Sequence, residues 1–154
     1  MIWIIAALAS LGNMQAGHAQ TANADVTAND GTNILFEAYR QVAAMPDFAI
    51  EEIKNNSDYG FPAAFGKGRF TGYGNSDPKA DVLRVLEIVP AKYLKYENVD
   101  SRGKIRRLYV DSSDKNNVKT LFFFGGIGGN DLIVAYFENG NGSEIGDYIQ
   151  ALNQ

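Results

Sequence analysis

The chain of 154 residues contains no cysteine, and its only histidine and only tryptophan, His18 and Trp3, both fall within the first nineteen residues. Without cysteine there is no disulfide framework and no thiol nucleophile. If the first nineteen residues are removed, no imidazole remains, which excludes a Ser-His-Asp triad and the usual zinc sites built from nitrogen and sulfur ligands. The sequence therefore indicates a protein that is not an enzyme and holds no cofactor or metal.

The chain also lacks a basic surplus, because its formal net charge is −4. A mildly acidic protein has no general electrostatic attraction for nucleic acid or for an anionic membrane. We therefore expect no nucleic-acid partner. A protein, a peptide, a glycan or a second copy of the chain remain as possible partners.

The first nineteen residues read as a secretory signal peptide. An apolar run, IWIIAALASLG, is followed by the small-residue exit AGHA, with Gly17 and Ala19 at the −3 and −1 positions before Gln20. A basic segment before the apolar run is missing. The alternative is a membrane anchor, but the run is shorter than the roughly 20 residues that span a bilayer. We expect cleavage, no stable membrane insertion afterwards, and a periplasmic or secreted product.

Residues 20–33 are small and polar without periodicity, which is typical of a disordered lead-in, so that residues 34–154 form a single domain. Apolar spacing predicts helices over 34–45, 76–89 and 143–152, and strands over 94–99, 104–111, 118–124 and 131–138. Residues 48–53 favour a short strand or a turn. Residues 57–75, rich in glycine and aromatics, break every periodic pattern and are predicted to be irregular. The fold class is α+β, with an antiparallel meander of three to four strands packed with about three helices.

The segment GGIGGND at 125–131 suggests three kinds of ligand loop. A phosphate loop and a dinucleotide loop both require a helix to follow, and here a strand follows. A calcium β-roll requires many stacked copies of its motif, and this chain has one. A glycine-rich hairpin turn is the favoured interpretation. The loop at 111–114 similarly favours a solvated hairpin over a calcium site, since Ser113 and Lys115 occupy two ligand positions.

Both faces of the predicted sheet are apolar, so either the helices and the glycine and aromatic stretch cover both faces, or one face meets a partner. If the hairpin loops are symmetric, Leu108 and Val110 share one face with Leu121, and Arg107 and Tyr109 share the other with Phe122. Two candidate surfaces follow: Tyr96, Arg107, Tyr109 and Phe122 on that second face, or Tyr59, Phe65, Lys67, Arg69 and Tyr73 in the glycine and aromatic stretch.

The predicted function is an exported, non-enzymatic binding or interaction module of the cell envelope. The alternative is a small hydrolase that uses two carboxyl groups about 5–10 Å apart to act on a glycan. In its order of elements, from the signal peptide through KIRRLYVD and TLFFFGGIGGNDLIVAYF to a short amphipathic helix, the chain resembles small secreted domains of unknown function from gut Bacteroidota. That resemblance implies a compact α+β domain in the cell envelope or outside the cell, and no particular activity.

Overall fold

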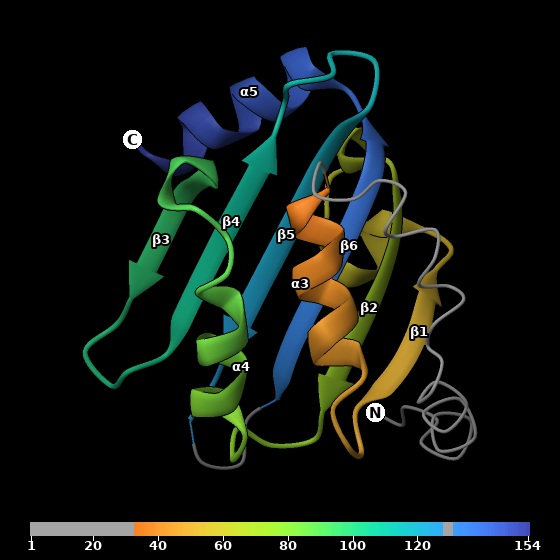
Figure 1. Cartoon of the computed structure of the whole chain (residues 1–154). Coiled ribbons are helices and arrows are strands. Elements are labelled where there is room, and N and C mark those ends of the chain that lie inside the picture. The colour runs from red at the N-terminus through yellow and green to blue at the C-terminus, as the bar shows by residue number, and fades with distance from the viewer. Residues whose placement is uncertain (1–32, 128–130) are drawn as a thin grey trace.

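The fold is built on one antiparallel sheet of six strands, and the computed structural model describes residues 33–127 and 131–154. The strands lie in the order β1-β2-β6-β5-β4-β3 (Figure 1). Their bounds are β1 (Ala49–Ile53), β2 (Lys67–Tyr73), β3 (Leu94–Val99), β4 (Ile105–Asp111), β5 (Val118–Gly125) and β6 (Leu132–Gly140). The α+β class and the antiparallel sheet are confirmed. The predicted number of three to four strands was wrong.

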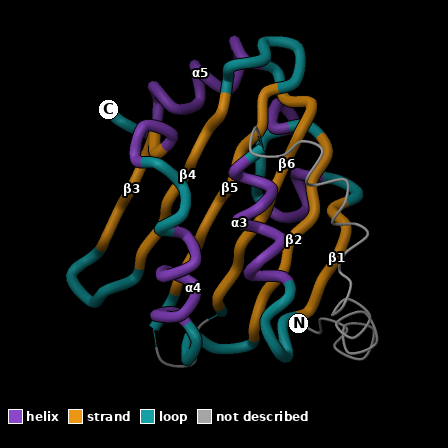
Figure 2. The backbone as a smooth tube through the Cα atoms, in the orientation of Figure 1, coloured by secondary structure: helices purple, strands orange, loops and turns teal. Residues whose placement is uncertain are grey.

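Within the described residues, three α-helices cover the two faces of this sheet unequally. The helices α3 (Ile34–Ala43) and α4 (Lys79–Leu86) lie across one face. The helix α5 (Gly142–Leu152) lies at the end of the sheet where β3 begins and β4 ends (Figure 1, Figure 2). The other face is covered by α5 and by two single turns, η2 (Asn56–Tyr59) and η3 (Ala63–Phe65). A third such turn, η4 (Ala91–Tyr93), leads into β3.

Local sequence signals explain where α3 and α5 begin. The Asn33 side chain accepts a hydrogen bond from the Phe36 amide, and the Asn141 side chain accepts one from the Glu144 amide, so both helices have a side-chain N-cap. By contrast, α4 is shorter at both ends than the predicted 76–89. Pro78 holds its N-cap position without a side-chain hydrogen bond, and Glu87 holds its C-cap position. The predicted signal peptide and nearly all of the lead-in lie outside the described residues.

The two faces of the sheet carry two separate hydrophobic cores. Under α3 and α4 the core is formed by residues such as Tyr39, Val42, Phe123 and Tyr136, all buried. On the opposite face the core is formed by Phe65, Phe70, Leu108, Phe137, Ile145 and their neighbours. Both sheet faces therefore have a cover, as their apolar composition requires.

Strand register corrects the predicted faces for β4. The strands β5 and β6 divide as expected, but Leu108 pairs with Phe122 and Tyr109 pairs with Leu121. The loop after Asp111 contains one residue more than symmetry would give, because Asp111 pairs with Lys119. A slip of one residue moves every side chain of a strand to the other face. Arg107 and Tyr109 therefore face α3 and α4 rather than the side of Phe122.

The strand β2 occupies part of the stretch that was predicted to be irregular. It pairs with both β1 and β6 and so joins the N-terminal hairpin to the C-terminal strands. Its glycines hide the strand pattern, but Gly68 is there because the ring of Phe137 takes up its side-chain space: an added Cβ would lie 2.4 Å from the Phe137 Cε2 atom. The weaker expectation of a strand at 48–53 is confirmed by β1.

Candidate binding pocket

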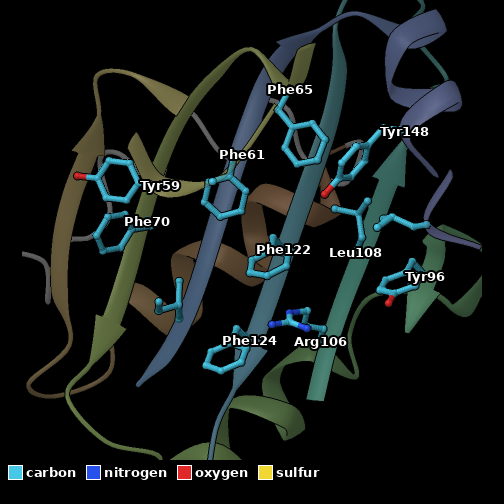
Figure 3. A pocket seen from close by; sticks show the side chains of 13 residues that line it. Tyr59, Phe61, Phe65, Phe70, Tyr96, Arg106, Leu108, Phe122, Phe124 and Tyr148 are labelled. Carbon is cyan, nitrogen blue, oxygen red and sulfur yellow. The ribbon is translucent and has the colours of Figure 1, made fainter. Parts of the chain in front are cut away.

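A pocket of about 520 Å³ opens on the sheet face that carries α5 (Figure 3). Its size lies within the range of 300–1,000 Å³ that is usual for small-molecule sites. Its lining consists of eight aromatic residues, three aliphatic residues, one glycine and one arginine: Tyr59, Phe61, Phe65, Phe70, Tyr96, Phe122, Phe124, Tyr148, Leu108, Ile133, Leu152, Gly60 and Arg106. The strands supply its floor, while the loop at 56–66 and α5 supply its walls.

The loop at 56–66 is held by a buried asparagine. The Asn56 side-chain amide donates to the Pro62 carbonyl at 3.1 Å and to the Gly66 carbonyl at 2.9 Å, which draws the two ends of the loop together. Gly60 and Gly66 adopt positive φ angles of 81° and 92°, a conformation that glycine tolerates at no steric cost. The backbone is thereby fixed in a shape that directs Phe61 and Phe65 over the sheet.

Ring contacts join this loop to the floor of the pocket. Phe61 meets Phe122 and Phe137 edge to face, with centroids 5.1 and 5.0 Å apart. Phe65 meets Tyr148 of α5 in the same way at 5.4 Å. Edge-to-face pairs of this kind contribute about 0.5–1.5 kcal/mol beyond their buried area. The wall of the pocket is therefore a connected set of rings that holds its shape without a ligand.

Three of the four polar side chains that line the pocket, Arg106, Tyr96 and Tyr148, lie on one side, and the fourth, Tyr59, lies across from them (Figure 3). The Arg106 guanidinium lies 5.5 Å from the centre of the Phe124 ring. Burial raises the pKa of Tyr148, as does the neighbouring Tyr96, while the charge of Arg106 acts in the opposite direction. All three side chains line the pocket, and Figure 3 shows Arg106 beside the rings of its floor.

Arg106 has no acidic partner among the described residues. The ion pairs found in that part of the chain join Arg40 to Glu37, Arg84 to Asp81, and Arg107 to Glu97. The adjacent Arg107 shows the contrast, because it donates to Glu97 at 2.7 Å and to the Tyr109 hydroxyl at 3.0 Å on the opposite face. The single cation of the pocket is thus available to a ligand.

The structure brings four of the nine predicted surface residues together in this pocket, namely Tyr59, Phe65, Tyr96 and Phe122. The other five are placed elsewhere: Arg107, Tyr109, Lys67, Arg69 and Tyr73. Arg69 lies 5.7 Å over the ring of Phe36 in α3, Tyr73 packs with Phe48, and Lys67 alternates in step with Arg69 along β2. These five side chains accordingly belong to the face of α3 and α4.

Sequence reasoning missed Arg106, Phe124 and Tyr148 as site residues. Arg106 and Phe124 are directly paired across β4 and β5, a relation that the one-residue register error concealed. Tyr148 could have been found, since it lies on the apolar stripe of the predicted C-terminal helix. Its ring packs in the core of this sheet face and also forms part of the pocket wall.

The pocket lining contains no pair of carboxyl groups, because none of its thirteen residues is an aspartate or a glutamate. Within residues 33–127 and 131–154, no group of three or more histidine, cysteine, aspartate or glutamate side chains is placed to hold a metal ion. None of the helices in the described ranges has the length and apolar character needed to cross a membrane.

The two loops that the sequence linked to ligands join neighbouring strands. Gly125 pairs with Leu132, so 125–131 connects β5 and β6 as a hairpin, although residues 128–130 lie outside the described part. In the other loop the Asp111 carboxylate accepts hydrogen bonds from the Ser113 amide and hydroxyl, at 3.0 and 2.7 Å. That carboxylate stabilises the start of the turn between β4 and β5.

Comparisons of the chain with protein-family models, with curated proteins and with solved structures each return no match.

Proposed function

We propose that this protein is an exported, non-enzymatic binding module of the cell envelope, and that its ligand site is the aromatic pocket on the α5 face. The observation that carries the proposal is the lining: eleven of the thirteen residues are aromatic or aliphatic, and the rings hold one another in place. Pockets with mostly apolar walls and a few polar groups are the usual form of a small-molecule site.

The chemistry of the lining favours an apolar ligand over a glycan. A sugar presents hydroxyl groups around its whole edge. Burial of each hydroxyl group without a hydrogen-bond partner makes the free energy of binding less favourable. The polar side chains of the lining are Arg106 and three tyrosines, of which Tyr59 already donates to Glu51 at 3.3 Å. An apolar body fits this surface with fewer unsatisfied groups. The absence of acids from the lining also favours binding over carboxylate-dependent hydrolysis at this site.

The test is calorimetric titration of the purified chain with a neutral aromatic probe, naphthylethanol. Ile133 lies on the floor of the pocket, so Ile133→Trp fills the space and should weaken binding by more than about 10-fold, which corresponds to about 1.4 kcal/mol. The matched control is Ile88→Trp, because Ile88 is exposed and does not line the pocket. Failure of the original chain to bind the probe, or equal binding by both variants, would count against the proposed function.

Export is tested separately, by expressing the chain with its own N-terminal segment and determining the mass of the product in the periplasm and in the medium. Cleavage after Ala19 should give a chain that begins at Gln20. Retention of the intact segment, with the protein in the cytoplasm, would overturn the exported part of the proposal.

A further inference from the structure

The pocket combines an aromatic body with one cation at its side, and this combination defines the ligand more narrowly than apolar character alone. Arg106 lines the pocket, is exposed, and contacts the Phe124 ring through its guanidinium. An arginine on a ring keeps several N–H donors free, because the ring occupies only one face of the guanidinium plane. Those donors form a fork that matches a carboxylate.

We propose that the pocket binds an amphiphilic acid, in which an apolar body of one or two rings carries a single carboxylate that Arg106 holds. This inference rests on the proposed function, since it requires the pocket to be a ligand site. The apolar body lies among Phe61, Phe122 and Ile133, and the carboxylate lies toward Arg106 at the open side.

Charge complementarity separates this ligand from the cation that an aromatic pocket could also hold. Aromatic faces attract quaternary ammonium groups, but a cation in this pocket would be repelled by Arg106 and would find no acid in the lining. An anion would be attracted by Arg106, which forms no ion pair with any described residue, and would be repelled by no acid among the thirteen lining residues. The whole chain carries a net charge of −4, so this attraction is local to Arg106 rather than general.

The tyrosines Tyr96 and Tyr148 complete the polar side of the pocket. Both line the pocket together with Arg106, and Figure 3 shows the two rings on the same side of the pocket as the guanidinium. A hydroxyl group can donate to a carboxylate oxygen without adding charge. The side of the pocket that carries Arg106 therefore also carries two neutral side chains that can donate hydrogen bonds.

The experiment compares two probes of nearly equal shape, naphthylacetate and naphthylethanol, by calorimetric titration at neutral pH and low salt. The original chain should bind the acid about 3- to 10-fold more tightly than the alcohol, as expected for a charge-assisted contact at a partly exposed site. Arg106→Met keeps an apolar stem on Phe124 but removes the charge. This variant should lose the preference for the acid, so that the two probes bind it with nearly equal affinity.

Arg102→Met is the matched control, since Arg102 is exposed in the turn between β3 and β4 and does not line the pocket. It removes the same charge from the chain and should keep the preference for the acid. A preference that is absent in the original chain, or that survives Arg106→Met, overturns the inference and leaves the proposed function intact. Failure of both probes to bind the original chain overturns the proposed function as well. Denaturant unfolding of Arg106→Met with a cooperative transition like that of the original chain shows that the variant is folded.

Discussion

Gly68 on β2 and Phe137 on β6 are directly paired across the sheet, and the Phe137 ring fills the space that a side chain at Gly68 would need. The Phe137 side chain is fully buried and supports both Phe61 and Phe65, which line the pocket. The glycine in β2 therefore leaves room for the ring on which Phe61 and Phe65 of the pocket wall pack.

Gly68→Ala should lower the free energy of unfolding by about 1–3 kcal/mol, the usual effect of overpacking a filled core. The added methyl would lie 2.4 Å from Phe137 and 3.2 Å from the Ile53 Cδ1 atom, so the ring must move. Denaturant unfolding measures the change. The control is Gly146→Ala in α5, where nothing lies within 4 Å of the added methyl and helix propensity predicts a gain of about 0.5–1 kcal/mol. Similar destabilisation by both variants would contradict the packing argument.

The same pair of residues explains why β2 could not be read from the sequence. Glycine is depleted in strands because it has no side chain to pack, so Gly66, Gly68 and Gly72 indicate a loop. In the structure the missing packing is supplied from outside the strand, by a ring of β6 at Gly68 and by backbone atoms of residues 138 and 139 at Gly66. These packing partners lie more than sixty residues further along the chain. The local sequence around β2 therefore gives no sign of them.

The elements with a local cause were predictable, and the relations between them were not. The caps at Asn33 and Asn141 and the apolar stripe of α3 follow from neighbouring residues, so these helices and the strands β4, β5 and β6 were expected near their observed positions. The β4 register depends on a single extra loop residue before Lys119, and that residue decides whether Arg106 or Arg107 belongs to the pocket. The candidate site was therefore only partly predictable from the sequence.

Asn56→Ala should destabilise the protein by about 1–3 kcal/mol and weaken binding of naphthylethanol. Asn56 is buried, and its amide donates to the Pro62 and Gly66 carbonyls. Both of these hydrogen bonds would be lost in the variant, although the Pro62 carbonyl would still accept from the Phe65 amide. The loop that carries Phe61 and Phe65 would then lose the link between its ends. Denaturant unfolding and calorimetric titration give the two readouts. Asn98→Ala on the exposed edge strand β3 is the control and should stay within about 0.5 kcal/mol of the original chain. Unchanged binding in a folded Asn56→Ala variant would show that the loop does not shape the pocket.

The rings of Tyr39 in α3 and Tyr136 in β6 have centroids 6.1 Å apart. Loss of the hydroxyl group should change the free energy of unfolding differently at these two positions. The Tyr136 hydroxyl accepts from the Asn33 side chain and donates to Glu138, both at 3.1 Å, so Tyr136→Phe should lower the free energy of unfolding by about 1 kcal/mol. The Tyr39 hydroxyl is buried and has no hydrogen-bond partner among the described residues. Tyr39→Phe should therefore leave stability unchanged or raise it by up to about 1 kcal/mol. Equal losses from the two changes, measured by denaturant unfolding, would show that Tyr39 has a partner in the folded protein.

The same tyrosines should make the protein less stable in alkaline solution. Burial raises the pKa of Tyr39 and of Tyr136 above the ordinary value of 10.0, and Glu138 adds to the effect at Tyr136. Below that value both the folded and the unfolded chain hold these protons, so the contribution to stability is constant. Above it the unfolded chain releases protons that the folded chain retains, so the free energy of unfolding falls as pH rises, by up to about 1.4 kcal/mol per pH unit for each tyrosine.

Denaturant unfolding over a pH series that passes through 10.0 measures this slope. Because lysines also titrate in this range, the informative quantity is the difference between the original chain and Tyr136→Phe. The free energy of unfolding of this variant should fall less steeply with pH, by up to about 1.4 kcal/mol per pH unit. Tyr39→Phe should reduce the slope by a similar amount while starting from equal or greater stability, since its hydroxyl has no partner among the described residues. Parallel pH profiles for the original chain and the two variants would mean that both hydroxyl groups ionise as readily in the folded protein as in the unfolded chain.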